Sequence, residues 1–266
     1  MSAIGSALVV HAIFEWLALA IGAQIYRRTS ARSELATTDS RQRLLLLFGA
    51  VLGAATGNKL AFLIYDPQIL DAGLFGRNII VGGQSIVGGL LGGLLGVELT
   101  KRLTGFKSST GDAFVVPILV GIIIGRIGCF IAGLQDGTFG NATMLPWGYD
   151  FGDGIPRHPT QIYDQLFALT LLVVLARLRP TVRVVPGLEF KLMLAAYLAW
   201  RLAVDSIKPK PFLYPLHMSG IQLVCVVALV LYLPLLMSAL GKLRRIRSAA
   251  GPAPAGAPAF AERGAK

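Results

Sequence analysis

The sequence predicts an all-α, polytopic membrane protein with seven transmembrane helices, and three observations lead to this fold class. Of the 266 residues, 54% are hydrophobic and only 15% are charged. The mean hydropathy is +0.65, which is high for a water-soluble domain of this length. Apolar segments long enough to cross a bilayer, about 20 residues each, recur along the chain. Because these segments lack the alternation of barrel strands, each is expected to be a helix that satisfies its own backbone.

The apolar segments account for most of the chain. No basic residue precedes the first one, whereas Arg27 and Arg28 follow it, so we interpret it as a retained span and not as a cleaved signal peptide. Residues 1–248 are predicted to form one transmembrane domain, and residues 249–266 a disordered, Ala/Pro/Gly-rich cytoplasmic tail. The seven segments lie near residues 5–26, 43–64, 79–99, 113–134, 161–178, 187–205 and 214–240.

Lysine and arginine residues concentrate in the loops on one side of the predicted helices, which the positive-inside rule makes the cytoplasmic side. The N-terminus is therefore expected outside and the C-terminus in the cytoplasm. The net charge of +11 suits anionic lipid headgroups, and no basic patch is interleaved with aromatic residues as in a nucleic-acid site. The outer loops hold only Arg77, Arg157, Lys208 and Lys210. The cytoplasmic loops hold Arg27, Arg28, Arg32, Arg41, Arg43, Lys101, Arg102, Lys107, Arg177, Arg179, Arg183, Lys242, Arg244, Arg245 and Arg247.

The second and third segments carry a lysine and a run of glycines. An ionisable residue inside a span is costly and is a functional candidate, so Lys59, near the outer end of the second segment, either contacts lipid or snorkels to the surface. The third segment reads "VGGQSIVGGLLGGLLGVEL", and its small residues favour close helix packing. Gly88 and Gly89 lie at the outer depth, where a missing side chain could instead admit an acyl chain or headgroup.

The fourth and fifth segments place polar groups in the outer half of the membrane. Arg126 lies about eight residues, or roughly 12 Å, beneath the outer surface. It could instead form a structural ion pair with Glu15 or Asp164. The fifth helix should start at Pro159, with His158 before it as a capping or catalytic residue, and should present free N–H groups that attract an anion.

The sixth segment adds Arg201 near its outer end, while Lys191 lies near the inner end and is expected to snorkel. Several positive groups at one depth, without a matching acid cluster, predict a bound anion. In a membrane the expected anion is a lipid phosphate, which arginine grips with a bidentate fork. The two cysteines, Cys129 and Cys225, both lie inside spans, so a disulfide framework is not expected.

Several motifs together resemble the prolipoprotein diacylglyceryl transferase family, over roughly Phe14 to Gln222. "RHPTQIYDQL" is similar to that family's Arg-His-Pro-Ser-Gln-Leu-Tyr-Glu, and Tyr197 and Arg201 match its Tyr-x-x-x-Arg pair. Each motif alone is weak, whereas their order, spacing and topology are fairly specific. The other matching stretches are "GNKLAFLIYD", "GGQSIVGG" and "GRIGCFIAG".

The resemblance implies a multi-pass enzyme of the bacterial inner membrane. Its expected reaction transfers the diacylglyceryl group of phosphatidylglycerol to the lipobox cysteine thiol of a prolipoprotein, forming a thioether and releasing glycerol phosphate. It implies no metal and no cofactor. The implied catalytic residues are Arg126, Arg201 and His158, and Tyr163 would belong to the same outer site. The implied phospholipid-binding residues are Arg126, Arg201, Tyr197, Lys59, Ser85, Gly88, Gly89 and Gln161.

The chain departs from the family pattern near the reacting centre. Val87 stands where the family usually has a histidine proposed to activate the thiol, and Leu17 where a tyrosine is common. The signature Gly-Arg-x-Gly-Asn-Phe-x-Asn-x-Glu reads "GRIGCFIAGL", so Cys129, Ala132 and Leu134 replace two amides and a carboxylate. Cys129 is interpreted as a small buried hydrophobe, with a covalent intermediate as the alternative.

These departures leave three functions open. The chain could be a diacylglyceryl transferase whose thiol is activated by the phosphate itself or by His158. It could be a paralogue that uses phosphatidylglycerol with another acceptor or another chemistry. It could also be a non-catalytic phospholipid-binding protein. A transporter or channel is disfavoured, because the sequence has no visible inverted repeat and no acid-rich relay across the midplane.

Overall fold

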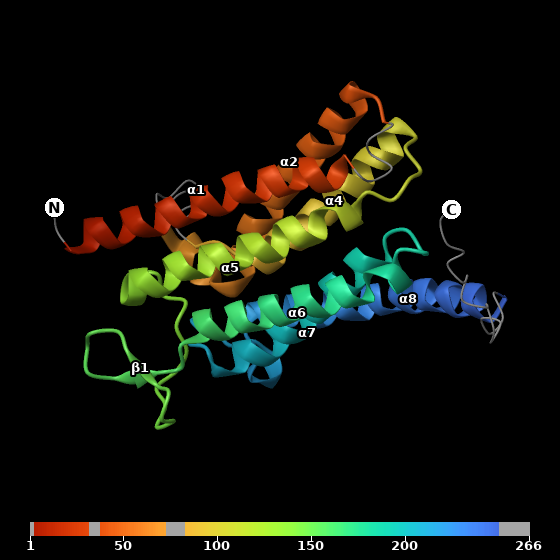
Figure 1. The fold of residues 1–266 in the computed structure, drawn as a ribbon. Coiled ribbons are helices and arrows are strands. Elements are labelled where there is room, and N and C mark those ends of the chain that lie inside the picture. The colour runs from red at the N-terminus through yellow and green to blue at the C-terminus, as the bar shows by residue number, and fades with distance from the viewer. Residues whose placement is uncertain (1–2, 32–37, 73–82, 250–266) are drawn as a thin grey trace, which may run out of the picture.

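The computed structural model describes residues 3–31, 38–72 and 83–249, and over these ranges the chain is almost entirely helical. Most of the long helices run roughly along one axis, with the start of α1 and a small hairpin at one end and the end of α8 at the other (Figure 1). The long helices are α1 (Ala3–Ser30), α2 (Ser40–Tyr65), α4 (Ile86–Thr104), α5 (Val115–Ala132), α6 (Thr160–Val182), α7 (Leu188–Val204) and α8 (Gly220–Ala249). The short elements are the 3-10 turns η2 (Pro67–Ala72), η3 (Gly111–Phe114), η4 (Gly133–Gln135), η5 (Asp205–Ile207) and η6 (Pro215–His217), and the antiparallel strands β1 (Tyr149–Asp150) and β2 (Pro156–Arg157).

The composition of the helices confirms a polytopic helical membrane protein. Among the described residues, five helical segments are long and apolar enough to cross a membrane. These segments are 9–30, 40–65, 111–135, 160–182 and 220–249. The remaining long helices, α4 and α7, have 19 and 17 residues and do not belong to that set.

Two helices begin later than the sequence predicts. The third apolar segment is expected from residue 79, but α4 begins at Ile86, after Ser85 accepts the N–H of Gly88 at 3.3 Å and caps the helix; residues 79–82 lie outside the described ranges. The last segment is expected from residue 214, but α8 begins at Gly220. Leu216 and His217 have φ angles of 64° and 56°, which a right-handed helix does not accommodate.

The end of α8 bears on the predicted tail. The helix continues through Ala249, because the basic stretch before it consists largely of good helix formers. The predicted boundary at residues 248 and 249 stays a prediction. Residues 250–266, and with them the predicted disorder of the tail, lie outside the described ranges.

Glycines bring α2 and α4 into direct backbone contact. A Cβ atom added at Gly53 would lie 2.2 Å from the carbonyl oxygen of Gly92, and one at Gly57 would lie 2.3 Å from that of Gly88. The reverse substitution at Gly88 would meet Gly57 O at 2.2 Å, so no side chain fits on either surface. The glycines of the third segment therefore serve mainly as the small-residue packing interface that the sequence predicts.

The main apolar core joins α2, α4, α5, α6, α7 and α8. Val87, Leu119 and Leu194 are completely buried within it. A second buried group lies near the start of α7, where Glu189 bridges Arg179 and Arg183 at 2.8 and 3.1 Å. Lys191 donates to the carbonyl of Gly187 at 3.4 Å, which fits its predicted structural role. The contacts of Glu189 link the start of α7 to the end of α6.

Candidate functional site

Arg126 on α5 and Arg201 on α7 meet at one carboxylate. Arg126 Nη2 lies 2.8 Å from Asp164 Oδ2, and Arg201 Nη1 lies 3.5 Å from the same oxygen. The side chains of the two arginines are only 8% and 10% exposed, and that of Asp164, on α6, is 1% exposed. Trp200 Nε1 donates to the other carboxylate oxygen at 2.7 Å. The structure thus brings together the two arginines that the sequence predicts to share a site.

The expectation that no acid accompanies these arginines is wrong. Besides Asp164, Arg201 Nη2 contacts Asp205 Oδ1 at 3.2 Å, and Asp205 also accepts a hydrogen bond from the hydroxyl of Ser219. A buried charge is costly unless it is paired, so the helices supply carboxylates from α6 and η5. The ion pair between Arg126 and Asp164, which the sequence leaves open, is present. The contact of Asp205 with Arg201, four residues before it, was not predicted, because the sequence does not show which side chains share a buried face.

Lys208 adds a third basic group at the outer edge of this cluster. It follows η5 and is only 7% exposed. Its pKa is lowered from 10.5 to about 7, first by burial and then by the positive charges of Arg201 and Arg126, while Asp164 and Asp205 oppose the shift. The cluster therefore gains a positive charge when the pH falls below about 7.

Several buried polar atoms in this region lack a hydrogen-bond partner among the described residues. They include Nε of Arg126, Nε of Arg201 and the hydroxyl of Tyr197. Both polar atoms of the Gln161 amide are also unpartnered, although this side chain is fully buried. Tyr197 and Arg201 are four residues apart on α7 and share one face, as do Gln161 and Asp164 on α6. Such a set of unused donors is what a bound anion would satisfy.

A large apolar cavity lies between α2, α4 and α8 and has a volume of about 1250 Å³. Asn58 and Ser85 line one part of it, and Gly89 and Phe190 line others. At Gly89 the nearest atom to an added Cβ would be Ala54 O at 3.9 Å, so this position leaves open space. Gly88 instead faces the backbone of α2 at Gly57 and is not among the described residues that line the cavity, so its role as a lipid contact stays a prediction.

Lys59 and the two arginines do not line this cavity. Lys59 follows Asn58 on α2, but it is not among the described residues that line the cavity. Arg126, Arg201, Tyr197 and Gln161 are also absent from that lining. The predicted phospholipid-binding residues are thus divided between an apolar cavity and a separate charged cluster.

His158 lies in the loop that precedes α6. Its Nδ1 is 3.3 Å from the hydroxyl of Tyr163, which also accepts from Trp147 Nε1 at 2.8 Å. Its carbonyl accepts the N–H groups of Gly140 and Thr160 at 2.9 and 2.8 Å. The helix begins at Thr160, one residue after the predicted start, and the expectation of a free N–H at Thr160 is wrong because His158 already accepts it. None of these contacts joins His158 to Arg126 or Arg201.

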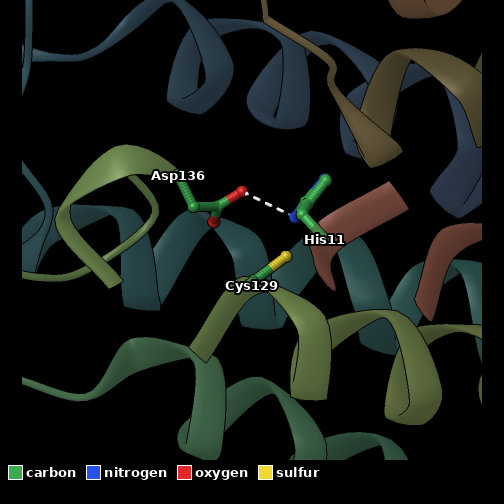
Figure 2. A group of neighbouring side chains, drawn as sticks. All are labelled: His11, Cys129 and Asp136. Carbon is green, nitrogen blue, oxygen red and sulfur yellow. Dashed lines mark ion pairs between the residues drawn. The ribbon is translucent and has the colours of Figure 1, made fainter. Parts of the chain in front are cut away.

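A second polar group, which the sequence argument did not identify, lies where α1 packs on α5. His11 Nδ1 is 3.1 Å from Asp136 Oδ1, and its Nε2 is 3.2 Å from Glu15 Oε1. The Cys129 sulfur lies beside this pair, and the three side chains converge in Figure 2. The only sequence signal was a histidine and a glutamate at i and i+4 on an apolar helix.

The sequence has named relatives. The family described as prolipoprotein diacylglyceryl transferase matches residues 1–238. A Rhizobium meliloti protein named phosphatidylglycerol–prolipoprotein diacylglyceryl transferase is 30% identical over 260 residues, which cover 94% of this chain and 89% of the relative. Proteins of the same name from Solidesulfovibrio magneticus and Coxiella burnetii are 36% and 33% identical, over 60% and 61% of this chain. The alignments with these two span 63% and 64% of the relatives, slightly less than two thirds of their length.

Proposed function

This chain belongs to the prolipoprotein diacylglyceryl transferase family, as its motifs predict, and we propose that it transfers the diacylglyceryl group of phosphatidylglycerol to the lipobox cysteine thiol of prolipoproteins. The observation that carries the proposal is the buried pair Arg126 and Arg201, held by Asp164 with both Nε atoms unpartnered. A phosphodiester is the anion in a membrane that would use these donors. The products would be the thioether and glycerol phosphate.

The proposed phosphate site consists of donors that are already in position. Asp164 takes one Nη of each arginine and fixes both guanidinium planes. Each plane keeps a buried Nε–H, and the hydroxyl of Tyr197 and the amide of Gln161 are further unused groups. Negative charge grows on the phosphate as the carbon–oxygen bond to the diacylglycerol breaks. Fixed donors aimed at that charge stabilise the transition state without reorganisation.

The acyl chains would occupy the cavity between α2, α4 and α8. Its volume of about 1250 Å³ exceeds that of most small-molecule sites, and its walls are largely apolar side chains. Ser85 and Gly89 line it, which supports their predicted role in lipid binding. Asn58, the residue before Lys59 on α2, lines the cavity, and Lys59 would contact the lipid headgroup from outside that lining.

The proposed topology has seven spans, with the N-terminus outside and the C-terminus in the cytoplasm of a bacterial inner membrane. Its support is the distribution of basic loop residues, together with α4 and α7 as helices that complete the bundle. Under this topology the arginine cluster and the β1–β2 hairpin belong to the outer side, where a prolipoprotein presents its lipobox. His158 would act there by organising the loop through Tyr163, and not by touching the phosphate.

A direct assay tests the function. Purified chain in micelles that contain phosphatidylglycerol is incubated with a lipobox peptide, and glycerol phosphate release is followed together with the mass of the peptide. We expect equal amounts of glycerol phosphate and of peptide that has gained one diacylglyceryl group. Binding of phosphatidylglycerol without any thioether product would reject this reaction in favour of another acceptor or a non-catalytic role.

A further inference from the structure

We propose that His11, Cys129 and Asp136 form a binding site for a divalent transition-metal ion of the zinc type. The thiol sulfur, one imidazole nitrogen and one carboxylate oxygen all lie within 4.8 Å of one another. These are the ligand types that zinc takes in proteins. The side chains point toward a common region between α1, the end of α5 and the turn that follows it (Figure 2).

The backbone brings these residues together through one close helix contact. A Cβ atom at Gly128 would lie 2.6 Å from Cβ of Phe14 and 3.4 Å from the carbonyl oxygen of His11. Only a glycine lets α1 approach α5 this closely, and the next residue of α5 is Cys129. Asp136 follows as the C-cap residue of η4, the 3-10 turn immediately after α5.

The orientation of His11 favours a metal over a catalytic triad. Its Nδ1 is the nitrogen that faces Asp136, at 3.1 Å but without good hydrogen-bond geometry, and Figure 2 places the Cys129 sulfur on the same side of the ring. In a triad the two ring nitrogens would face the thiol and the carboxylate separately. Here three donor atoms converge on one point, which is the arrangement of ligands around an ion.

Each of the three groups also has a partner on its far side. The Nε2 atom of His11 lies 3.2 Å from Glu15, the hydroxyl of Thr138 donates to the second oxygen of Asp136, and Arg126 Nη1 lies 3.7 Å from the Cys129 sulfur. A carboxylate behind a ligating histidine is the usual support of a zinc ligand.

Charge and access fit a bound dication. A thiolate, a carboxylate and a neutral imidazole around a divalent ion sum to zero, so the occupied site would carry no net charge in an apolar interface. The side chains of His11 and Glu15 are 23% and 41% exposed, which leaves a path for the ion. Tetrahedral zinc, with bonds of about 2.0–2.3 Å, needs ligand atoms roughly 3.3–3.7 Å apart, so modest side-chain closure would complete the site.

Three protein ligands leave a fourth position open, and on the proposed transferase function this position would take the thiol of the peptide substrate. A thiol that coordinates a metal ion is deprotonated, its proton passing to water. The sulfur electron pair would then form the bond to C3 of the diacylglycerol, while the carbon–oxygen bond to the phosphate breaks and its electrons leave on glycerol phosphate. Such activation would replace the family histidine that is absent at Val87, a completely buried residue here.

Metal binding is tested on the purified, tag-free full chain in micelles. After equilibration with Zn²⁺ and removal of free ion, we expect about one zinc per chain by mass spectrometry, as a single three-ligand site holds. Cys129→Asn restores the residue of the family signature, so it should fold, and we expect it to retain less than a tenth of that zinc. Cys225→Ala, which removes the other buried cysteine, is the matched control and should retain it all.

Two further measurements separate a built site from adventitious ions. With Co²⁺ in place of zinc, the wild-type chain should show a thiolate-to-cobalt charge-transfer band that Cys129→Asn lacks. Glu15→Gln, which changes only the support of His11, should weaken binding about 10- to 100-fold. Zinc retention that is equal in wild type and Cys129→Asn, or a cobalt spectrum without a thiolate band, would overturn the site.

The transfer assay distinguishes the metal site from its proposed role. If zinc binds as expected but no thioether forms under any condition, the metal site stands and the transferase function fails. If thioether forms at the same rate in the metal-free chain and in the zinc-loaded chain, thiol activation by the ion is overturned while the function stands. A rate that falls at least tenfold on metal removal and returns with zinc supports both.

Discussion

Two buried carboxylates each bridge a pair of arginines, and the two groups differ in what they leave unused. Near the start of α7, Glu189 accepts from Nε of both Arg179 and Arg183, at 2.9 and 3.1 Å. In the cluster of α5, α6 and α7, Asp164 accepts from the terminal nitrogens of Arg126 and Arg201, and both Nε atoms remain buried with no partner in the part of the chain that the structure describes. In the first group both Nε atoms are paired with the carboxylate, whereas in the second both are left for a ligand.

Exposure sharpens the same contrast. The side chains of Arg179 and Arg183 are 29% and 48% exposed, so water or headgroups can solvate whatever Glu189 does not. Those of Arg126 and Arg201 are 8% and 10% exposed and have no such outlet. A structural ion pair satisfies its members with the protein alone. A binding site leaves fixed, desolvated donors for a ligand, and the cluster around Asp164 has that character.

The largest effect is expected from removing the shared carboxylate charge. Asp164→Asn leaves two buried arginines poorly compensated and should lower the free energy of unfolding by about 3–5 kcal/mol. Glu189→Gln should cost clearly less, because its arginines can turn toward solvent. Thermal unfolding in micelles measures both. Equal losses from the two variants would contradict the distinction between a site and a structural bridge.

The next effect is on activity. Arg126→Lys keeps the charge but removes the planar fork and its Nε–H, so we expect glycerol phosphate release to fall about 100-fold or more. Arg179→Lys makes the same chemical change in the structural pair and should stay within about threefold of wild type in the same assay. A similar loss in both variants would mean that the unused donors of Arg126 have no special role.

A smaller effect is expected on the pH dependence of lipid binding. Of the two arginine groups, as far as the described residues go, the Asp164 cluster is the one that contains a lysine with a pKa near neutrality. The pKa of Lys208 is lowered to about 7, so the side chain is charged below that pH and neutral above it. Phosphatidylglycerol affinity should therefore rise about three- to tenfold as the pH falls from about 8 to about 6. In a lipid-binding titration, Lys208→Met should abolish this rise in affinity, whereas the loop control Lys210→Met should keep it. A Lys208→Met variant that retained the full pH dependence of the affinity would contradict the prediction.

The smallest effect is expected at the most exposed member of the two groups. Arg183→Ala removes a side chain that is 48% exposed, and Arg179 still contacts Glu189 at 2.8 Å. The free energy of unfolding should change by less than about 1 kcal/mol, and transfer activity should be unaffected. The free energies of unfolding of Arg183→Ala and of the control Arg183→Lys are compared by chemical or thermal unfolding. A loss of several kcal/mol would show that the Glu189 group is as constrained as the Asp164 cluster.

The sequence by itself determined the membrane class, the order of the helices and the two arginines of the site. Hydropathy and helix-forming patterns are local properties, and a charge inside an apolar segment is visible without knowing what surrounds it. The start of α6 after Pro159 could be read within one residue for the same reason. The family could be identified because its motifs are short and lie in the predicted order.

Only the tertiary structure decided what each polar residue faces. Asp164 joins Arg126 and Arg201 across three helices, so its role depends on how those helices are rotated and packed. Gly88 and Gly89 are adjacent in the chain, yet one meets the backbone of α2 and the other opens to the cavity, because neighbouring residues of a helix point about 100° apart. The convergence of His11, Cys129 and Asp136 likewise requires the close contact of α1 and α5 at Gly128, and no local pattern encodes a contact between distant segments.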